Sequence, residues 1–117
     1  EADEPVVYLV AETEGVVVGF AQCLSGDERP PNVDGDEAYL KSLYVHPDNW
    51  RDGIGSELLR EAISRLQRTV TRVRVSVLAA NTIGTRFYEI HDFEQIDNGT
   101  FDVGAVEYET TIYVREL

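Results

Sequence analysis

The chain has 117 residues, of which 43% are apolar, and it carries 10 Lys and Arg against 22 Asp and Glu, a formal charge of −12. This length fits one hydrophobic core, so residues 1–117 are predicted to form a single domain and a multidomain protein is excluded. There is no run of about 18 consecutive apolar residues, and the acidic N-terminus lacks the basic-then-apolar order of a signal peptide. We therefore expect no insertion into a membrane.

Cysteine and histidine usage argues against a disulfide framework and against a metal site. Cys23 is the single cysteine, and only His46 and His91 accompany it, which does not give the usual Cys/His spacing of a zinc site. We expect no metal, a reducing cytoplasm as the location, and Cys23 as a core residue of an apolar strand.

The negative charge is spread along the whole chain. Lys41 is the only lysine, and the other nine basic residues are Arg. Dispersed carboxylates with so little Lys fit the surface of a halophile's protein better than a patch that binds cations. A nucleic acid is a disfavoured partner, because affinity for it comes mainly from Lys and Arg that neutralise phosphates.

The first third of the chain has the composition of β-strands. Residues 6–11 and 16–24 are rich in β-branched and aromatic residues and are separated by a short loop that ends in Gly, so they predict a hairpin. Residues 25–36 are rich in Pro, Gly and Asp and predict a surface loop. Residues 38–45 predict a third strand, which should end at Pro47 because proline lacks the backbone donor.

The hydrophobic period changes from two to 3.6 at Ile54. One helical face then carries Ile54, Leu58, Leu59, Ala62, Ile63 and Leu66. Val73, Val75 and Val77 alternate with polar residues and predict a strand, and a second helix is expected at about residues 82–90, capped by Asn81 or Thr82. Two further strands at 93–97 and 108–114 give the order β-β-β-α-β-α-β-β, a mixed α/β domain.

Two glycines open the first predicted helix, in the sequence Gly53-Ile54-Gly55-Ser56. Backbone N–H groups in a first helical turn are unpaired and lie at the positive end of the helix dipole, so they can hold a phosphate or pyrophosphate. A simple turn that starts a helix is the other interpretation. A dinucleotide fingerprint would need a third Gly where Leu58 stands, and a P-loop would need a Lys followed by Ser or Thr.

The surrounding sequence resembles the GNAT superfamily of acyl-CoA-dependent N-acetyltransferases in two places. The first is LKSLYVHP at residues 40–47 with WRDGIGSELL at 50–59, which is similar to the family's central strand and coenzyme A loop. The second is NTIGTRFY at 81–88, ending in Asp92 and Phe93, which is similar to the family's second motif. Trp50, Arg51, Gly84 and Asp92 depart from the residues that are usual at their positions.

The resemblance implies a mixed, mostly antiparallel sheet flanked by helices, with the family's first strand and first two helices absent before Val6, so we expect that preceding residues are missing. It implies direct transfer of the acetyl group from acetyl-CoA to an amine. Tyr88 would be the general acid toward the leaving thiolate. The backbone of Leu43, Tyr44 and Val45, together with Asn81, would bind the pantetheine arm. The pyrophosphate would bind at Arg51, Asp52, Gly53, Ile54, Gly55 and Ser56.

Several alternatives stay open from the sequence. A non-catalytic acyl-CoA-binding or sensing module would keep the same fold and loop. A structural dimerisation domain, for example in a homodimer, could pair with its partner through an exposed strand at residues 108–114. Glu37 is either a general base that acts through water or a solvated surface carboxylate, and His91 is expected only as a residue at a helix end. The acceptor amine, whether a small molecule, a protein N-terminus or a Lys side chain, is not determined.

Overall fold

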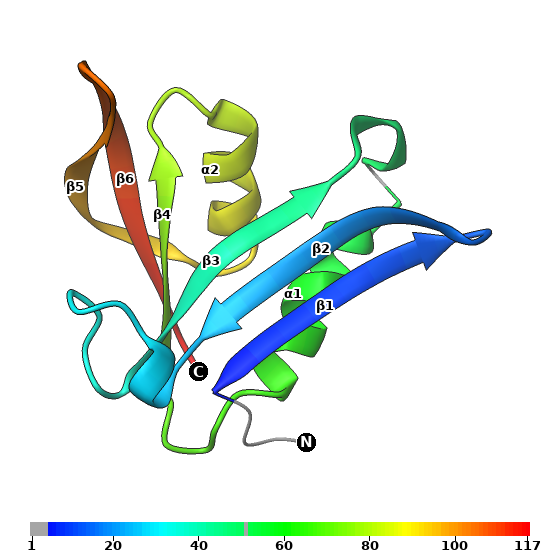
Figure 1. Cartoon of the computed structure of the whole chain (residues 1–117), viewed down its shortest axis with the longest axis horizontal. Helices are drawn as coiled ribbons and strands as arrows, with labels where there is room; N and C mark the ends of the chain where they lie inside the picture. The colour runs from blue at the N-terminus through cyan, green and yellow to red at the C-terminus, as the bar shows by residue number, and fades with distance from the viewer. Residues whose placement is uncertain (1–4, 51) are drawn as a thin grey trace.

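The computed structural model describes residues 5–50 and 52–117 as a six-stranded sheet with two helices (Figure 1). The strands are β1 (Val6–Thr13), β2 (Val16–Leu24), β3 (Glu37–Val45), β4 (Arg72–Leu78), β5 (Glu94–Val103) and β6 (Val106–Glu116), in the order β1-β2-β3-β4-β6-β5. The helices are α1 (Ile54–Ser64) and α2 (Thr82–Ile90), with 3-10 turns η1 (Gly26–Glu28) and η2 (Pro47–Asn49). All neighbouring strands are antiparallel except β3 and β4, so the predicted mixed α/β class is confirmed. No helix in the described part of the chain is long and apolar enough to cross a bilayer.

The two hairpins extend further than the sequence predicted. β1 continues to Thr13, and Glu14 and Gly15, both with positive φ, make the two-residue turn to β2. β5 and β6 run well beyond the predicted 93–97 and 108–114 and turn at Gly104, where φ is 60°. β5 is exposed over nearly its whole length, so it lacks the buried-exposed alternation that would have revealed it.

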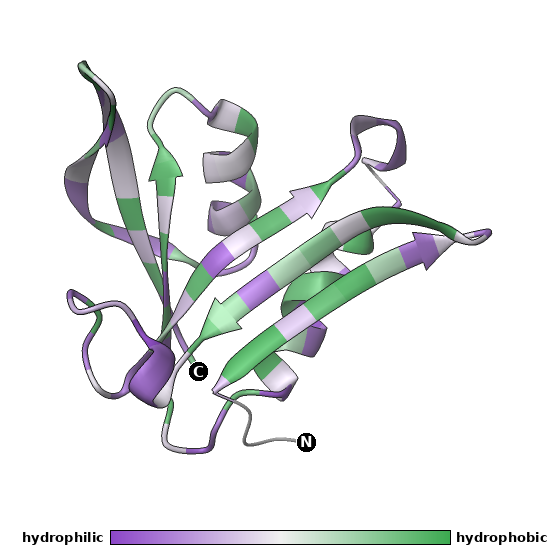
Figure 2. Ribbon diagram, in the orientation of Figure 1, coloured by the Kyte–Doolittle hydropathy of each residue, from purple (hydrophilic) through white to green (hydrophobic). Residues whose placement is uncertain are grey.

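α1 packs its apolar face against the half of the sheet formed by β1, β2 and β3. Leu59 and Ala62 of α1 join Val7, Cys23 and Leu40 in one continuous core, and hydrophobic residues run along β1 and β2 in Figure 2. Burial raises the pKa of the Cys23 thiol to about 12, which keeps it uncharged and unreactive. The prediction that this cysteine is a core residue is confirmed.

The sheet forks between β3 and β4. The two parallel strands pair only from Glu37 to Tyr39 on β3 and from Arg72 to Arg74 on β4, and beyond this point they diverge, as Figure 1 shows. β4 continues in antiparallel pairing with β6, whereas residues 40–45 of β3 have no partner strand on the edge that faces β4 among the described strands. The fork therefore leaves a length of extended backbone open to a ligand.

Glu37 clamps the closed end of this fork. Its side chain is fully buried, and its carboxylate accepts hydrogen bonds from Arg74 Nε at 2.9 Å and from the Asp34 amide at 3.2 Å, while Arg72 Nη2 lies 2.8 Å from it. Burial disfavours the charged carboxylate, but the Arg74 and Asp34 hydrogen bonds and the two guanidinium charges outweigh it and lower the pKa of Glu37. Neither predicted role for Glu37 is correct, because a buried, doubly paired carboxylate is neither a solvated surface group nor a free base.

The predicted dimerisation strand is also wrong. Residues 110–116 of β6 pair with β4 on one edge, and residues 106–114 pair with β5 on the other. Residues 110–114, which make up most of the predicted segment, are paired on both edges and have no free backbone to offer to a second chain. The edge strands of this sheet are β1 and β5.

Replacing Glu37 by Gln tests the clamp. The variant removes the buried carboxylate that both Arg72 and Arg74 contact, so we expect the free energy of unfolding to fall by about 3 kcal/mol at neutral pH in urea titrations. The matched control is Glu61→Gln, which breaks an exposed pair with Arg65 on α1 and should change the free energy by less than about 0.5 kcal/mol.

The Glu37 ion pairs also predict how the stability of the protein changes with pH. Because the folded-state pKa of Glu37 is lowered, its contribution is present above the unfolded-state pKa and is lost as the pH falls through the folded-state value. The difference in stability between the starting protein and Glu37→Gln should therefore shrink in acid. A difference that grows as the pH falls would contradict the ion-pair assignment.

Candidate functional site

The N-terminus of α1 presents backbone amides that have no partner among residues 5–50 and 52–117. Gly53 precedes the helix with φ 78°, a left-handed conformation that favours glycine, and it has no side chain to cap the helix. The first helical hydrogen bond runs from the Glu57 amide to the Gly53 carbonyl at 3.0 Å. Among the described residues, the N–H groups of Ile54, Gly55 and Ser56 have no hydrogen-bond acceptor, and they lie at the positive end of the helix dipole, where an anion can bind.

The segment between β3 and α1 is tied to the end of β3. Trp50 Nε1 donates a hydrogen bond of 2.7 Å to the Val45 carbonyl, and His46 Nδ1 accepts from the Asp48 amide at 3.2 Å. Trp50 thus fixes the start of the loop, at a position where the GNAT superfamily usually has Gln or Arg. Arg51, a predicted pyrophosphate ligand, lies outside the described residues.

The register of β3 decides which of its backbone groups face the fork. The His46 amide bonds to Val18 O at 2.7 Å and the Tyr44 carbonyl lies against Gly19, so the backbone of Tyr44 is directed toward β2. Antiparallel pairs alternate, so the backbone groups of Leu43 and Val45 are directed to the opposite edge, toward the fork. The Tyr44 ring stands on the sheet surface beside Phe20, with ring centroids 5.6 Å apart.

Asn81 begins α2 at the end of β4. Its Oδ1 accepts a hydrogen bond of 2.9 Å from the Gly84 amide, which is the predicted cap. A Cβ at Gly84 would lie only 2.5 Å from Asn81 Nδ2. This close approach explains why a glycine stands where the GNAT superfamily usually has Ala. The amide Nδ2 of Asn81 is a donor that the cap does not use.

Tyr88 lies on α2 inside an aromatic cluster near the fork. It is 7% exposed and makes edge-to-face contacts with Phe87 and Phe93, with centroids 5.2 Å apart in both cases. Burial raises the pKa of Tyr88, and the neighbouring Tyr39 phenol of β3 adds to this effect. The phenol therefore keeps its proton to high pH.

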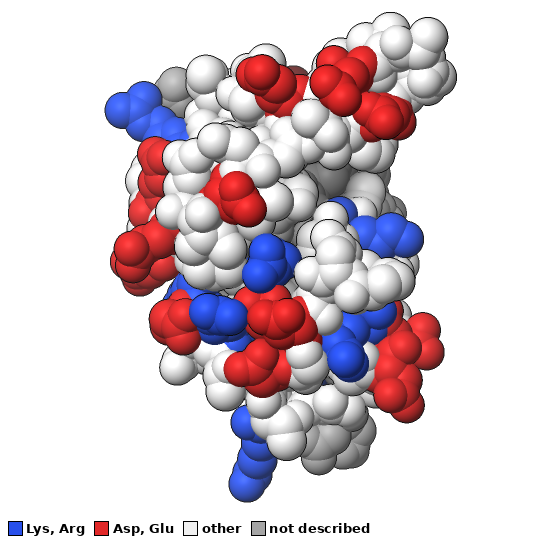
Figure 3. All heavy atoms as spheres, turned by 90° about the vertical axis from the view of Figure 1, so that its left-hand side faces the viewer, with Lys and Arg blue, Asp and Glu red and all other residues white. Residues whose placement is uncertain are grey.

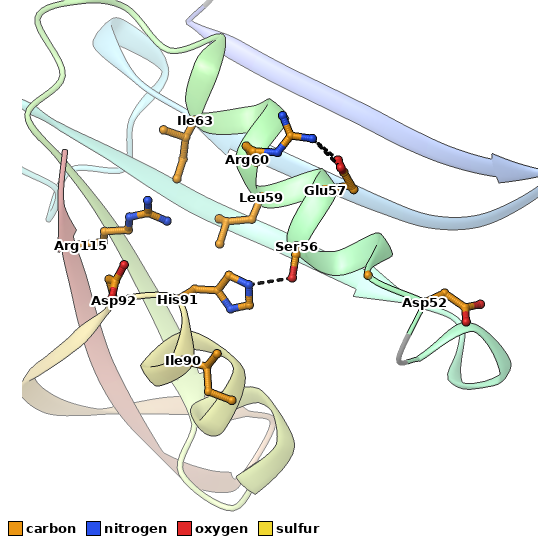
Figure 4. A pocket seen from close by; sticks show the side chains of 11 residues that line it. Asp52, Ser56, Glu57, Leu59, Arg60, Ile63, Ile90, His91, Asp92 and Arg115 are labelled. Carbon is orange, nitrogen blue, oxygen red and sulfur yellow. Dashed lines mark hydrogen bonds and ion pairs between the residues drawn. The ribbon is translucent and has the colours of Figure 1, made fainter.

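An open groove of about 550 Å³ runs between the first turns of α1, the end of α2 and Arg115 of β6 (Figure 4). The helices approach closely because Gly55 faces Phe87, where a Cβ would be only 3.2 Å from the ring. Ser56 Oγ and His91 Nε2 meet across the groove at 2.7 Å. This pair could not be predicted from the sequence, since no local pattern connects residues that are 35 positions apart.

The acetyltransferase (GNAT) family model matches residues 1–93, well over half of the chain. The chain belongs to the GNAT acetyltransferase family. An uncharacterized N-acetyltransferase from Mycobacterium tuberculosis is 28% identical to this GNAT chain over 110 residues, which cover 93% of the chain and 66% of that relative. The chain thus spans slightly less than two thirds of the length of that curated relative.

Solved GNAT structures have the same fold. The ribosomal-protein-alanine N-acetyltransferase from Brucella melitensis is 28% identical with a TM-score of 0.77, and the match covers 96% of this chain and 69% of that one. The PaiA N-acetyltransferase from Thermoplasma acidophilum, solved with coenzyme A, is 23% identical with a TM-score of 0.72, covering 97% of this chain and 62% of that one. These matches confirm the GNAT fold expected from the sequence.

The fork and the start of α1 bring most of the predicted site residues of this GNAT domain into one region. Gly55 of α1 lies against both Val45 of β3 and Phe87 of α2, so the three elements meet at one glycine. The roles of Leu43, Tyr44, Val45, Asp52, Gly53, Ile54, Gly55, Ser56, Asn81 and Tyr88 stay predictions. Across residues 5–50 and 52–117, no cluster of three or more His, Cys, Asp or Glu side chains could hold a metal ion.

Gly53→Ala tests the amide cradle against a matched control. Gly53 and Gly15 have φ of 78° and 80°, and apart from the adjoining residues no atom of the described residues lies within 4 Å of an added Cβ at either position. Both Ala variants should lose about 1 kcal/mol of stability from left-handed strain, measured by urea unfolding. Only Gly53→Ala should weaken binding of coenzyme A, by about ten-fold in calorimetry. Equal affinities in the two variants would contradict a ligand role for the cradle.

Proposed function

We propose that this GNAT domain transfers the acetyl group of acetyl-CoA directly to an amine acceptor. The observation that carries the proposal is the fork between β3 and β4, whose open edge leads to the uncapped N-terminus of α1. An extended edge followed by an anion cradle suits a ligand with an extended amide-containing arm and a pyrophosphate. Acetyl-CoA has both, and family membership supports the assignment.

The cofactor is held mainly by backbone groups in this proposal. The pantetheine arm lies along β3 as an added strand would, bonded to Leu43 and Val45, with the unused Nδ2 of Asn81 as a further donor. The Val45 carbonyl is already bonded to Trp50, so Val45 contributes its N–H. The amides of Ile54, Gly55 and Ser56 take the pyrophosphate.

Tyr88 is the general acid of the proposed reaction. A neutral amine attacks the thioester carbonyl, the C–N bond forms, the C–S bond breaks, and the Tyr88 O–H protonates the departing thiolate. The phenolate then regains a proton that the new amide nitrogen has released to solvent. Burial raises the pKa of the Tyr88 phenol and so makes it a weaker acid. Burial would also raise the pKa of the leaving thiol, as it does for Cys23 within this protein, so the two effects oppose each other in the proton transfer.

The acceptor is an amine of a small molecule, a protein N-terminus or a Lys side chain. The Brucella neighbour is named for action on a ribosomal-protein alanine, which supports a protein N-terminus among these options. The charge of −12 supports a cationic acceptor. Figure 3 shows Arg side chains beside Asp and Glu on the face that carries β5, an arrangement that suits neither a nucleic acid nor an anionic membrane surface.

The proposed setting is a reducing cytoplasm with high salt. The single cysteine is buried, so its thiol takes no part in disulfide formation. At about 1 M salt the screening length is about 3 Å, so the excess of surface carboxylates acts weakly on an anionic cofactor and the close backbone contacts dominate.

Binding of coenzyme A is the first test, and Trp50 is a built-in probe. It is the only tryptophan and lies immediately before the cradle, so coenzyme A should change its emission. Coenzyme A at 100 times its Kd should add about 2.7 kcal/mol of stability and raise Tm. No change in Tm or emission in a folded sample would refute the proposal for this chain, whereas binding without acetyl transfer to any amine would favour the acyl-CoA-binding module.

Tyr88→Phe tests the chemistry separately from binding. With acetyl-CoA and a panel of amines, thiol release should fall by about 10²-fold or more while affinity for coenzyme A changes little. Tyr113→Phe is the matched control, because it removes a phenol hydroxyl from the same aromatic cluster, one that bonds Glu89. Since the pKa of Tyr88 is raised, no loss of activity from its ionisation is expected below about pH 10. Equal rates for Tyr88→Phe and the starting protein would eliminate this role.

A further inference from the structure

The tautomer of His91 is fixed by its surroundings at the end of α2. Its Nδ1 lies 2.8 Å from the Phe87 carbonyl oxygen, which can only accept a hydrogen bond, so Nδ1 carries a proton in both charge states. The imidazole also stacks on the Phe87 ring at a centroid distance of 4.2 Å. These two contacts hold Nε2 toward Ser56 Oγ, 2.7 Å away.

The charge of His91 therefore determines which way the Ser56 hydroxyl points. When His91 is neutral, Nε2 has no proton, and the Ser56 O–H must donate to it. When His91 is protonated, Nε2–H donates to Ser56 Oγ, and the hydroxyl proton is released for another acceptor. Protonation thus turns Ser56 from a group that offers only lone pairs into one that can donate to a ligand oxygen.

Ser56 stands where an anion would gain most from this change. It is the third residue of α1, its own amide has no acceptor in the part of the chain that the structure describes, and its hydroxyl and His91 line the same groove (Figure 4). The charged residues that line the groove from every described element are Asp52, Glu57, Arg60, Asp92 and Arg115. Among these described residues, three carboxylates against two guanidiniums leave one net negative charge, which a protonated His91 balances.

We propose that His91 is a positioning residue that couples its own protonation to the binding of the coenzyme A pyrophosphate through Ser56. The inference rests on the proposed function and adds a regulation by pH to the same site. The pyrophosphate is a permanent anion and favours the protonated histidine, both through its charge and through the released Ser56 proton. Binding tightens as the pH falls, weakens as the pH rises, and takes up a proton from solvent when it starts from neutral His91.

The ligand for the test is 3′-dephospho-coenzyme A. The 3′-phosphate of coenzyme A would itself titrate near pH 6, whereas the dephospho form keeps only the pyrophosphate, whose charge is constant in this range. Affinity is measured by calorimetry at about pH 6 and about pH 8, in buffers of different ionisation enthalpy so that proton uptake is obtained as well.

Three variants separate the coupling from a general effect of charge or structure. His91→Gln can donate to Ser56 but does not titrate, and Ser56→Ala removes the hydroxyl at an exposed position with little risk to folding. His46→Gln is the matched control, since it removes the other histidine, which caps η2 and does not line the groove. Thermal unfolding confirms that each variant is folded.

The starting protein and His46→Gln should bind 3′-dephospho-coenzyme A about ten-fold more tightly at the lower pH, and binding should take up a proton. The affinity of His91→Gln for the same ligand should change less than about two-fold between the two pH values. Ser56→Ala should have a smaller pH effect than the starting protein. An equal pH effect in the starting protein and His91→Gln, or in the starting protein and Ser56→Ala, overturns the inference while the binding site stands. Absence of binding at both pH values in folded protein refutes the proposed function itself, and the inference with it.

Discussion

A buried carboxylate between two arginines joins the two halves of this sheet. β3 and β4 share only three residue pairs, and Glu37, Arg72 and Arg74 belong to those pairs. A fully buried carboxylate is tolerated only when it is paired and hydrogen-bonded, so the clamp forms only where both strands are aligned. Beyond it the strands diverge, and the open edge of β3, the start of α1 and the place of Tyr88 all depend on where that divergence begins.

The groups that the fork offers to a ligand are largely backbone N–H and C=O groups. The uncapped amides of α1 and the edge of β3 do not change with side-chain identity, and Gly53, Gly55 and Trp50 serve to hold that backbone in position. Such a site is compatible with a chain of net charge −12, because close amide donors act at short range while distant carboxylates are screened by salt. In the proposed function, side chains are needed where protons move, at Tyr88 and at the Ser56 and His91 pair.

Much of the fold could be predicted because its signals are local. The alternation of Val73, Val75 and Val77 and the helical period from Ile54 follow from which face each residue must bury. The Asn81 cap could be predicted for the same reason, since its partner is three residues away. The length of β5 could not be predicted, because an exposed edge strand has no such pattern. The glycines and motif of residues 50–59 predict a coenzyme A loop, and the role of each residue in it stays a prediction.

The sequence by itself determined the two helices, most strand positions, the core role of Cys23 and the likeness to the GNAT family, because each depends on residues that are close in the chain. Only the tertiary structure decided that Glu37 is a clamp, that residues 110–114 of β6 are paired on both edges, and that Ser56 meets His91. The physical reason is distance along the chain: Glu37 and Arg74 are 37 residues apart, and Ser56 and His91 are 35 apart. Such groups acquire partners, altered pKa values or fixed tautomers only when packing brings them together.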